Sequence, residues 1–253
     1  MNINEMIVGV RIGIAQNPNT PVDVLVMLSS DIDYDVRAGV ARNPNTPVEI
    51  LVKLSSDHNV RVRCRVALNL NTPVDILAKL STDGDREVRR CVINNPNTPV
   101  DVLVQLSADD HYVVRYDLAK SPNTPADILA KLATDIDYDV RREVADNPNT
   151  PVNVLVSLST DEDNVVRRIV ARNRRTPVEI LIQLSTDVHY IVKMGVAEND
   201  NTPVDVLVKL STDEDWHVRR EVSQNANTSV DALLMLSRDS NWIVREFARA
   251  LIH

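Results

Sequence analysis

The 253-residue sequence has few aromatic residues, glycines and cysteines. Aromatic residues make up only 3% of it, so the core must be built from aliphatic side chains. Five glycines against thirteen prolines are too few for a chain rich in flexible loops. No apolar run approaches the roughly 18 residues of a membrane span, and the first ten residues lack the basic stretch of a secretory signal. The sequence therefore predicts a folded, cytoplasmic protein with no membrane partner.

The cysteine content and the net charge exclude further classes of protein. Cys64 and Cys91 are the only cysteines, which excludes a disulfide framework, and their spacing is not that of metal ligands. We expect both to be free thiols with the structural role of small buried residues. The formal net charge of −8 disfavours a surface coated with nucleic acid, although it leaves room for a local basic face.

A 26-residue repeat organises the sequence from Asn17 onwards. Thr20 recurs in all nine copies, Pro21 recurs in eight, and Asp, Glu or Asn stands at the position of Asp23. This order is typical of a helix start, with the Thr hydroxyl accepting from a backbone N–H, Pro in the first turn and an acid near the positive end of the dipole. The pattern predicts a first helix at roughly Pro21–Ser30, preceded by an Asn-Pro-Asn turn.

Each repeat is expected to contain two short helices. The first is apolar on nearly all sides, which indicates burial between neighbouring elements. The second is predicted over Tyr34–Arg42, with Asp33 as its N-cap and Val36 and Val40 on one face. Because helices of about ten residues do not persist alone, the repeats must stabilise one another by stacking.

Stacked two-helix repeats predict an all-α fold of the α-solenoid type. We expect one repeat domain over residues 1–253, without an internal boundary. Within it, residues 1–19 form an N-terminal cap and half repeat, residues 20–245 form the repeats, and residues 246–253 form a C-terminal cap.

The repeat resembles the leucine-rich repeat variant family. The residues that carry the resemblance are Leu25–Leu28, Asp31, Val36–Ala41 and Asn43–Pro47 and their counterparts over almost the whole chain. The resemblance implies a right-handed superhelix in which α-helices alternate with 3₁₀-helices, so the second helix should be partly 3₁₀. It implies no defined activity, and the iron–sulfur cluster of one type of member is not expected because no cysteine precedes Cys64.

Two charged columns and one aromatic column run through the repeats. Asp31 is Asp in every copy, and the column of Arg11 is broken only by Lys193. Columns that barely vary favour a scaffold role, in which each Arg bonds to an Asp or a loop carbonyl, over a ladder of phosphate-binding groups. The aromatic column could stack the bases of a single strand, but its interruptions favour packing against the adjacent turn. It contains Tyr34, Tyr112, Tyr138, Tyr190, Trp216 and Trp242.

The columns that vary lie on the second helix and are the candidate binding surface. Because the scaffold does not dictate them, they could encode specificity, or they could be a drifting solvated face. Two clusters of arginines stand out there, and in the second cluster two arginines replace the usual Pro-Asn of the turn. The candidate partner-binding residues are Arg61, Arg63, Arg65, Arg90, Tyr116, Arg142, Arg168, Arg172, Arg174, Arg175 and Arg220.

No sequence pattern of a catalytic, cofactor-binding or metal site stands out. The five histidines are scattered, and neither a Gly-rich phosphate loop nor a nucleophile elbow occurs. We therefore predict a non-enzymatic scaffold, without a cofactor, that binds macromolecules through the variable face of its second helices. A protein is the favoured partner, nucleic acid bound through the arginine clusters is the alternative, and an undetected enzyme is the third hypothesis.

Overall fold

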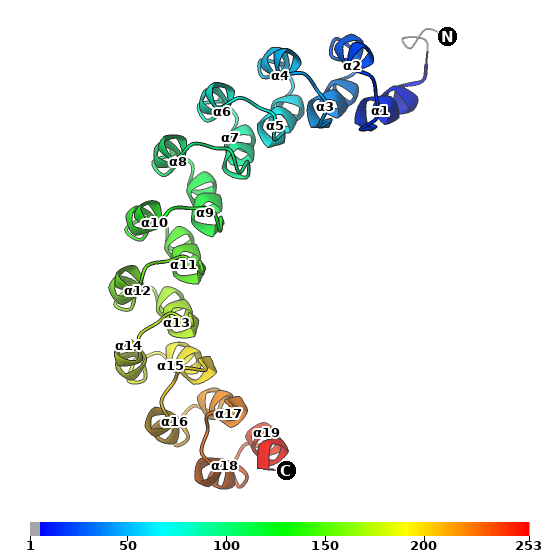
Figure 1. Cartoon of the computed structure of the whole chain (residues 1–253). Coiled ribbons are helices and arrows are strands. Elements are labelled where there is room, and N and C mark those ends of the chain that lie inside the picture. Colours follow the sequence, from blue (N-terminus) through cyan, green and yellow to red (C-terminus); the bar gives the residue numbers. More distant parts are fainter. Residues whose placement is uncertain (1–5, 253) are drawn as a thin grey trace. The chain divides into compact units, whose positions relative to one another are not determined.

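The computed structural model describes residues 6–252 as two compact units that meet between Thr124 and Pro125. Residues 1–5 of the predicted N-terminal cap and residue 253 of the predicted C-terminal cap lie outside the described residues. Every regular element from residue 6 to residue 252 is an α-helix (Figure 1). The expectation of one repeat domain stays a prediction.

The helices alternate between the first and the second helix of each repeat. Unit 1 contains α1 (Val8–Gln16), α2 (Val22–Leu28), α3 (Tyr34–Arg42), α4 (Val48–Leu54), α5 (Val60–Leu68), α6 (Val74–Leu80), α7 (Arg86–Ile93), α8 (Val100–Leu106) and α9 (Tyr112–Lys120). Unit 2 contains α10 (Ala126–Leu132), α11 (Tyr138–Asp146), α12 (Val152–Leu158), α13 (Asn164–Arg172), α14 (Val178–Leu184), α15 (Tyr190–Glu198), α16 (Val204–Leu210), α17 (Trp216–Gln224), α18 (Val230–Leu236) and α19 (Trp242–Ile252).

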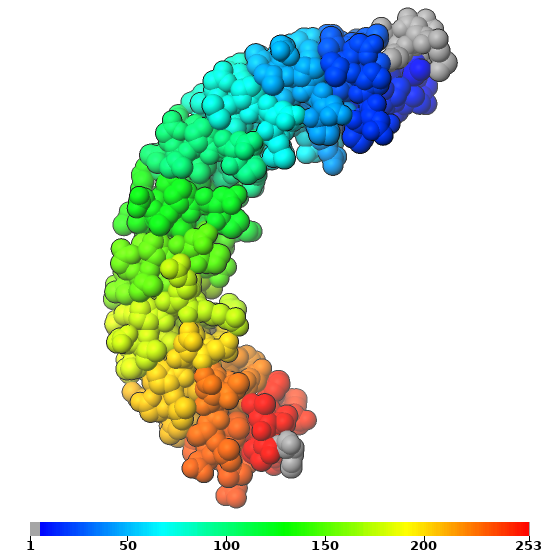
Figure 2. All heavy atoms as spheres, in the orientation of Figure 1, coloured from blue at the N-terminus to red at the C-terminus, as the bar shows by residue number. Residues whose placement is uncertain are grey.

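Within each unit the second helices stack on one another, as α3 does on α5 and α13 on α15. Within each unit, successive repeats are in close contact in the space-filling view (Figure 2). The core between the two helix rows is aliphatic, and in the first repeat Leu25, Val36 and Val40 are completely buried. The predicted all-α fold of stacked two-helix repeats is confirmed.

The second helices begin where the sequence predicts. In α3 the carboxylate of Asp33 accepts from the backbone N–H of Asp35 at 2.8 Å, and the helix spans Tyr34–Arg42 as expected. The helices are α-helical, and hydrogen bonds over three residues occur in their end turns. In α5 these are Val62 N–H to Asn59 O at 3.1 Å at the start and Asn69 N–H to Val66 O at 3.0 Å at the end. The 3₁₀ character implied by the family resemblance is therefore limited to such turns.

The first helices begin differently from the prediction. The Thr20 hydroxyl does not accept from the helix that follows; it donates to the Ile14 carbonyl of the helix before it, at 2.5 Å. Pro21 is extended, and α2 starts one residue later, at Val22. The predicted Thr cap is wrong because the Asn17 turn folds Thr20 back over the end of α1, where the last carbonyls lack partners within the helix.

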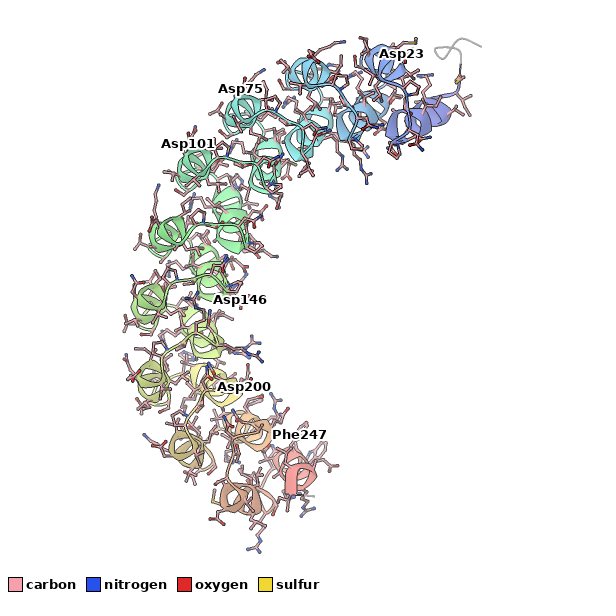
Figure 3. All side chains as sticks on the ribbon, viewed as in Figure 1. Asp23, Asp75, Asp101, Asp146, Asp200 and Phe247 are labelled. Carbon is pink, nitrogen blue, oxygen red and sulfur yellow. The ribbon has the colours of Figure 1, made fainter. Side chains whose placement is uncertain are left out.

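The predicted burial of the first helices on all sides is also wrong. Leu25 and Leu28 of α2 are buried, whereas Val22 and Val26, four residues apart on another face, are about half exposed. Acidic residues of this row, such as Asp23, Asp75 and Asp101, point away from the second helices of unit 1 (Figure 3). The first helices thus form an outer layer that is packed on one side.

Candidate functional site

The columns of Arg11 and Asp31 form a ladder of ion pairs between neighbouring repeats. Arg37 donates from Nε and Nη2 to the two carboxylate oxygens of Asp57 at 2.6 and 3.0 Å, and from Nη1 to the Asp31 carbonyl at 2.8 Å. The side chains of Arg37 and Asp57 are only 8% and 7% exposed. Further pairs of the ladder include Arg11–Asp31, Arg63–Asp83, Arg89–Asp109, Arg141–Asp161, Arg167–Asp187, Lys193–Asp213 and Arg219–Asp239.

The ladder holds Arg37 and Asp57 in their charged forms. Burial raises the pKa of Asp57, but the hydrogen bonds from Arg37 and the Asn59 N–H, with the charge of Arg37, outweigh it and leave this pKa below its usual value. The hydrogen bond to Asp57 raises the pKa of Arg37. The scaffold interpretation of the Arg column is confirmed, and Arg63 belongs to the ladder and not to an open binding face.

A second ladder, of asparagines, was missed by the sequence analysis. The Asn43 side-chain amide is buried and donates to the carbonyls of Ala15 and Asn17 in the preceding repeat, both at 2.8 Å. Its oxygen also accepts from the Asn45 N–H at 2.9 Å, which forms the turn. The sequence does carry a signal for this ladder, because the position of Asn43 is Asn in eight of nine copies. A turn alone would also accept Asp or Ser there, so the preference for Asn indicates a further role for its NH₂ group.

The candidate arginines are mostly held by nearby carboxylates. Arg90 Nε lies 2.5 Å from Asp117, and both Arg168 and Arg172 bind Glu198, at 3.0 and 2.7 Å. Further ion pairs are Arg61–Asp35, Arg142–Asp139, Arg174–Asp200 and Arg220–Glu221. The structure therefore does not gather these arginines into an open basic cluster.

The remaining candidates also have neighbours within the chain. Arg175 donates to the Pro148 carbonyl at 3.1 Å, and the Lys120 ammonium lies 5.8 Å from the centre of the Tyr116 ring. The positions of Ala38 and Gly39 form a seam between successive second helices, where most side chains are buried or half-buried. These two columns of the predicted variable face are thus partly contacts between repeats, whereas its column of Arg42 is exposed in most repeats.

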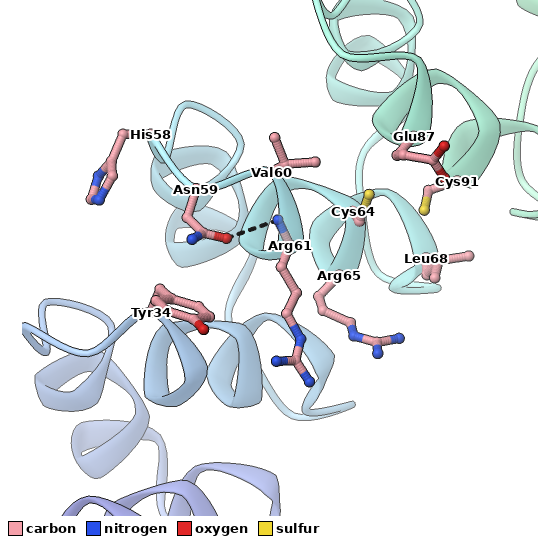
Figure 4. Close-up of a pocket in the computed structure, with 10 residues that line it drawn as sticks. All are labelled: Tyr34, His58, Asn59, Val60, Arg61, Cys64, Arg65, Leu68, Glu87 and Cys91. Atoms are coloured by element: carbon pink, nitrogen blue, oxygen red, sulfur yellow. Dashed lines mark hydrogen bonds between the residues drawn. The ribbon is translucent and has the colours of Figure 1, made fainter.

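One groove in unit 1 interrupts this seam, and it has a volume of about 690 Å³. Within residues 6–252 no carboxylate lies within ion-pair distance of Arg65, which lines the groove. Both cysteines line it as well, and Figure 4 shows them on neighbouring helices. The other lining residues are Tyr34, His58, Asn59, Val60, Arg61, Leu68 and Glu87.

The turns that join the two helices of a repeat expose apolar side chains. Ile32, Ile136 and Val188 are each 93% exposed, and each is followed two residues later by a tyrosine that is 41–47% exposed. We call the four of these residues that lie in unit 2 the apolar edge: Ile136, Tyr138, Val188 and Tyr190. The predicted packing of the aromatic column is met only in part, for Trp216 stacks on His217 with ring centres 3.7 Å apart whereas these tyrosines stay half exposed.

Two further features concern the described residues only. No helix between residues 6 and 252 is both long enough and apolar enough to cross a membrane. Over the same range, no three His, Cys, Asp or Glu side chains come together as a set of metal ligands.

Comparison with known proteins relates the repeats to one family. Residues 34–58, 86–111 and 138–163 match a family described as leucine rich repeat variant. A solved structure described as a leucine-rich repeat variant with a novel repetitive protein structural motif is 28% identical over 88% of each chain, with a TM-score of 0.68. An engineered protein of known structure is 20% identical over 100% of this chain and 98% of its own, with a TM-score of 0.38. No curated protein matches in sequence.

Proposed function

The chain belongs to the leucine-rich repeat variant family, and from this premise we propose that it is a non-enzymatic scaffold that binds a protein partner along its apolar edge. The invariant columns are occupied by contacts between repeats, so they hold the scaffold together. The residues that the scaffold does not use are the ones available to a partner.

The exposure of Ile136 and Val188 is the observation that carries the proposal. At 93% exposure these side chains contribute almost nothing to the stability of the fold, whereas burying one of them on binding yields about 1.5–3 kcal/mol. The turn itself does not require an aliphatic residue, because most other repeats have polar residues or glycine there. These are His58, Gly84, Asp110, Glu162, Glu214 and Ser240. Half-exposed tyrosines beside them are typical of protein interfaces.

The arrangement in unit 2 defines the chemistry of the partner. Ile136 and Val188 lie two repeats apart, which is roughly 16–20 Å at one helix layer of 8–10 Å per repeat. An extended segment covers that distance with about five or six residues at a rise of 3.3 Å each. Asp137 lies directly beside the first anchor, whereas Asp139 is already paired with Arg142, so the partner is an apolar segment with a basic residue beside that anchor.

The ion pairs favour a protein partner over nucleic acid. A phosphate backbone is bound by cationic groups that release its counterions. In this chain Arg90, Arg142 and Arg168 already have carboxylate partners, so binding phosphate would require breaking those pairs. Together with the net charge of −8, this reduces the attraction for a polyanion.

Selection of a random peptide library on the immobilised protein tests the proposal. We expect enriched peptides to carry two apolar residues five or six positions apart with a basic residue beside one of them. Affinity, measured by fluorescence anisotropy, should fall at least tenfold for Ile136→Asp and for Val188→Asp. Val204→Asp is the matched control, because Val204 is half exposed on the outer helix α16.

Two results would contradict the proposal. If the peptides bound the Ile136→Asp and Val188→Asp variants as tightly as the wild type, the apolar edge would be excluded as the binding site. Steeply salt-dependent binding of labelled DNA or RNA between about 50 and 200 mM salt, lost on Arg168→Glu or Arg175→Glu, would favour nucleic acid instead.

A further inference from the structure

The only two cysteines of the chain meet across the junction of α5 and α7. Cys64 occupies the repeat position of Ala38 and Cys91 that of Gly39 in the next repeat, so they are 27 residues apart, one period plus one. Figure 4 shows both thiols at this junction, beside the groove that both residues line. Neither cysteine is in a disulfide, and both residues are half-buried.

Equivalent junctions elsewhere show that side chains at these two positions converge. Arg90 and Asp117 stand in the same relation, and their side chains contact at 2.5 Å. Arg168 and Gly195 do so too, and a Cβ added to Gly195 would lie 3.1 Å from Arg168 Cγ. Because glycine has no side chain, α13 and α15 can approach more closely at Gly195 than two helices with larger residues there. This pair therefore shows that the two positions face each other, but not their distance in other repeats. A disulfide requires this convergence, with the Cβ atoms about 3.5–4.5 Å apart.

The surroundings of the pair assign different roles to its two sulfurs. A hydrogen bond with Cys64 lowers the pKa of Cys91, and the charges of Arg65 and Arg90 act in the same direction, whereas burial and the charge of Glu87 oppose them. The same hydrogen bond and burial raise the pKa of Cys64. Cys91 therefore loses its proton first and is the nucleophile, while Cys64 keeps its proton and is placed to react second.

We propose that Cys64 and Cys91 form a reversible thiol–disulfide site that exchanges with low-molecular-weight disulfides. The Cys91 thiolate attacks one sulfur of such a disulfide, forms a mixed disulfide and expels one thiolate. Cys64 then gives its proton to the solvent and attacks the Cys91 sulfur, which expels the second thiolate. In total the two protein thiols are oxidised to one disulfide, and the small disulfide is reduced to two thiols that take up the released protons.

The groove supports this reaction and does not depend on the proposed partner binding at the apolar edge. Its volume of about 690 Å³ admits a small disulfide to both sulfurs. Arg65, which has no carboxylate within ion-pair distance among residues 6–252, offers a positive charge to the developing thiolate and opposes the charge of Glu87 in the same groove. The product ties α5 to α7 and should reduce local opening between these two repeats.

The test uses the full chain, reduced and then incubated with oxidised glutathione at neutral pH. Acid quenching and mass spectrometry should show a Cys64–Cys91 cross-link with the loss of two hydrogens, and dithiothreitol should reverse it. Cys64→Ser should stop at one glutathione adduct on Cys91. Arg65→Met should slow the first step several-fold, whereas Arg61→Met should not, since Arg61 lines the same groove but is paired with Asp35.

Two outcomes would overturn the inference. One is a stable glutathione adduct on each cysteine without a cross-link, because it would show that the sulfurs cannot reach each other. The other is a pair of thiols that react only in urea, which would show that the groove does not admit the small disulfide. Circular dichroism of each variant separates these outcomes from loss of the fold.

Discussion

Replacing Asp57 by Asn removes a carboxylate that two neighbouring repeats share. In the wild type this carboxylate accepts from Arg37 Nε at 2.6 Å, from Arg37 Nη2 at 3.0 Å and from the Asn59 N–H at 2.9 Å. The asparagine keeps one acceptor oxygen and turns an NH₂ group towards donors. Arg37, whose side chain is 8% exposed, then keeps its charge without a carboxylate.

The size of the effect follows from burial. A hydrogen bond to a charged group contributes about 1.5–3 kcal/mol, and breaking a fully buried ion pair costs about 3–5 kcal/mol. Because the ladder lies at the edge of the core, we expect Asp57→Asn to lower the free energy of unfolding by about 2–4 kcal/mol. Asp35→Asn is the matched control: Arg61 and Asp35 are 57% and 31% exposed, so about 0–1 kcal/mol is expected.

Urea denaturation followed by circular dichroism measures the difference, and hydrogen exchange of α3 and α5 locates it. Equal midpoint shifts for Asp57→Asn and Asp35→Asn, or no shift for Asp57→Asn, would refute the reasoning. The pH dependence is a second test. Because the pKa of Asp57 is lowered in the folded state, its contribution is complete above the unfolded value of about 3.9 and is lost as the pH falls through the lower folded value. The gap between wild type and Asp57→Asn should therefore shrink below about pH 4.

Two further predictions concern the close contacts between repeats, and urea denaturation checks both. Asn43→Ala leaves the buried Ala15 carbonyl without this donor, removes a second bond to the Asn17 carbonyl and should cost about 1–3 kcal/mol. Asn45→Ala, at an exposed position, should cost less than about 1 kcal/mol. Gly195→Ala places a Cβ 2.7 Å from the Arg168 carbonyl oxygen and should destabilise by about 1–3 kcal/mol. Gly13→Ala meets open space in a helix and should stabilise by about 0.5–1 kcal/mol; the same sign for both glycines would contradict the packing argument.

The parts of the fold that depend on local chemistry could be predicted from the sequence. The second helix has the expected bounds because Asp33 caps it and its apolar residues follow the helical period. It could also be predicted that Arg37 bonds to an Asp. An Arg next to a buried valine needs a hydrogen-bond acceptor, and the Arg and Asp positions barely vary between copies of the repeat.

The parts that depend on the position of a neighbouring repeat could not be predicted from local chemistry. Thr20 is a residue type that often caps the start of a helix, but the turn before it places its hydroxyl at the end of the preceding helix, where it donates to the Ile14 carbonyl. Ala38 was assigned to a variable open face, although its position is a seam between second helices. Cys64 and Cys91 stand in different columns of the repeat, so the pattern of a single column does not pair them. The offset that brings them together is one period plus one residue.

The bonds that join the repeats connect residues close together in the sequence. Arg37 reaches Asp57 over 20 residues, and Asn43 reaches Asn17 and Ala15 over 26 and 28. Such low contact order favours fast folding that proceeds from one repeat to the next, so a growing chain can complete each repeat soon after the following one is synthesised. Because these spacings repeat every 26 residues, the duplication or deletion of 26 residues leaves each donor side chain opposite an equivalent acceptor in the neighbouring repeat. The number of repeats can therefore change over evolution without changes in the residues that bond neighbouring repeats together.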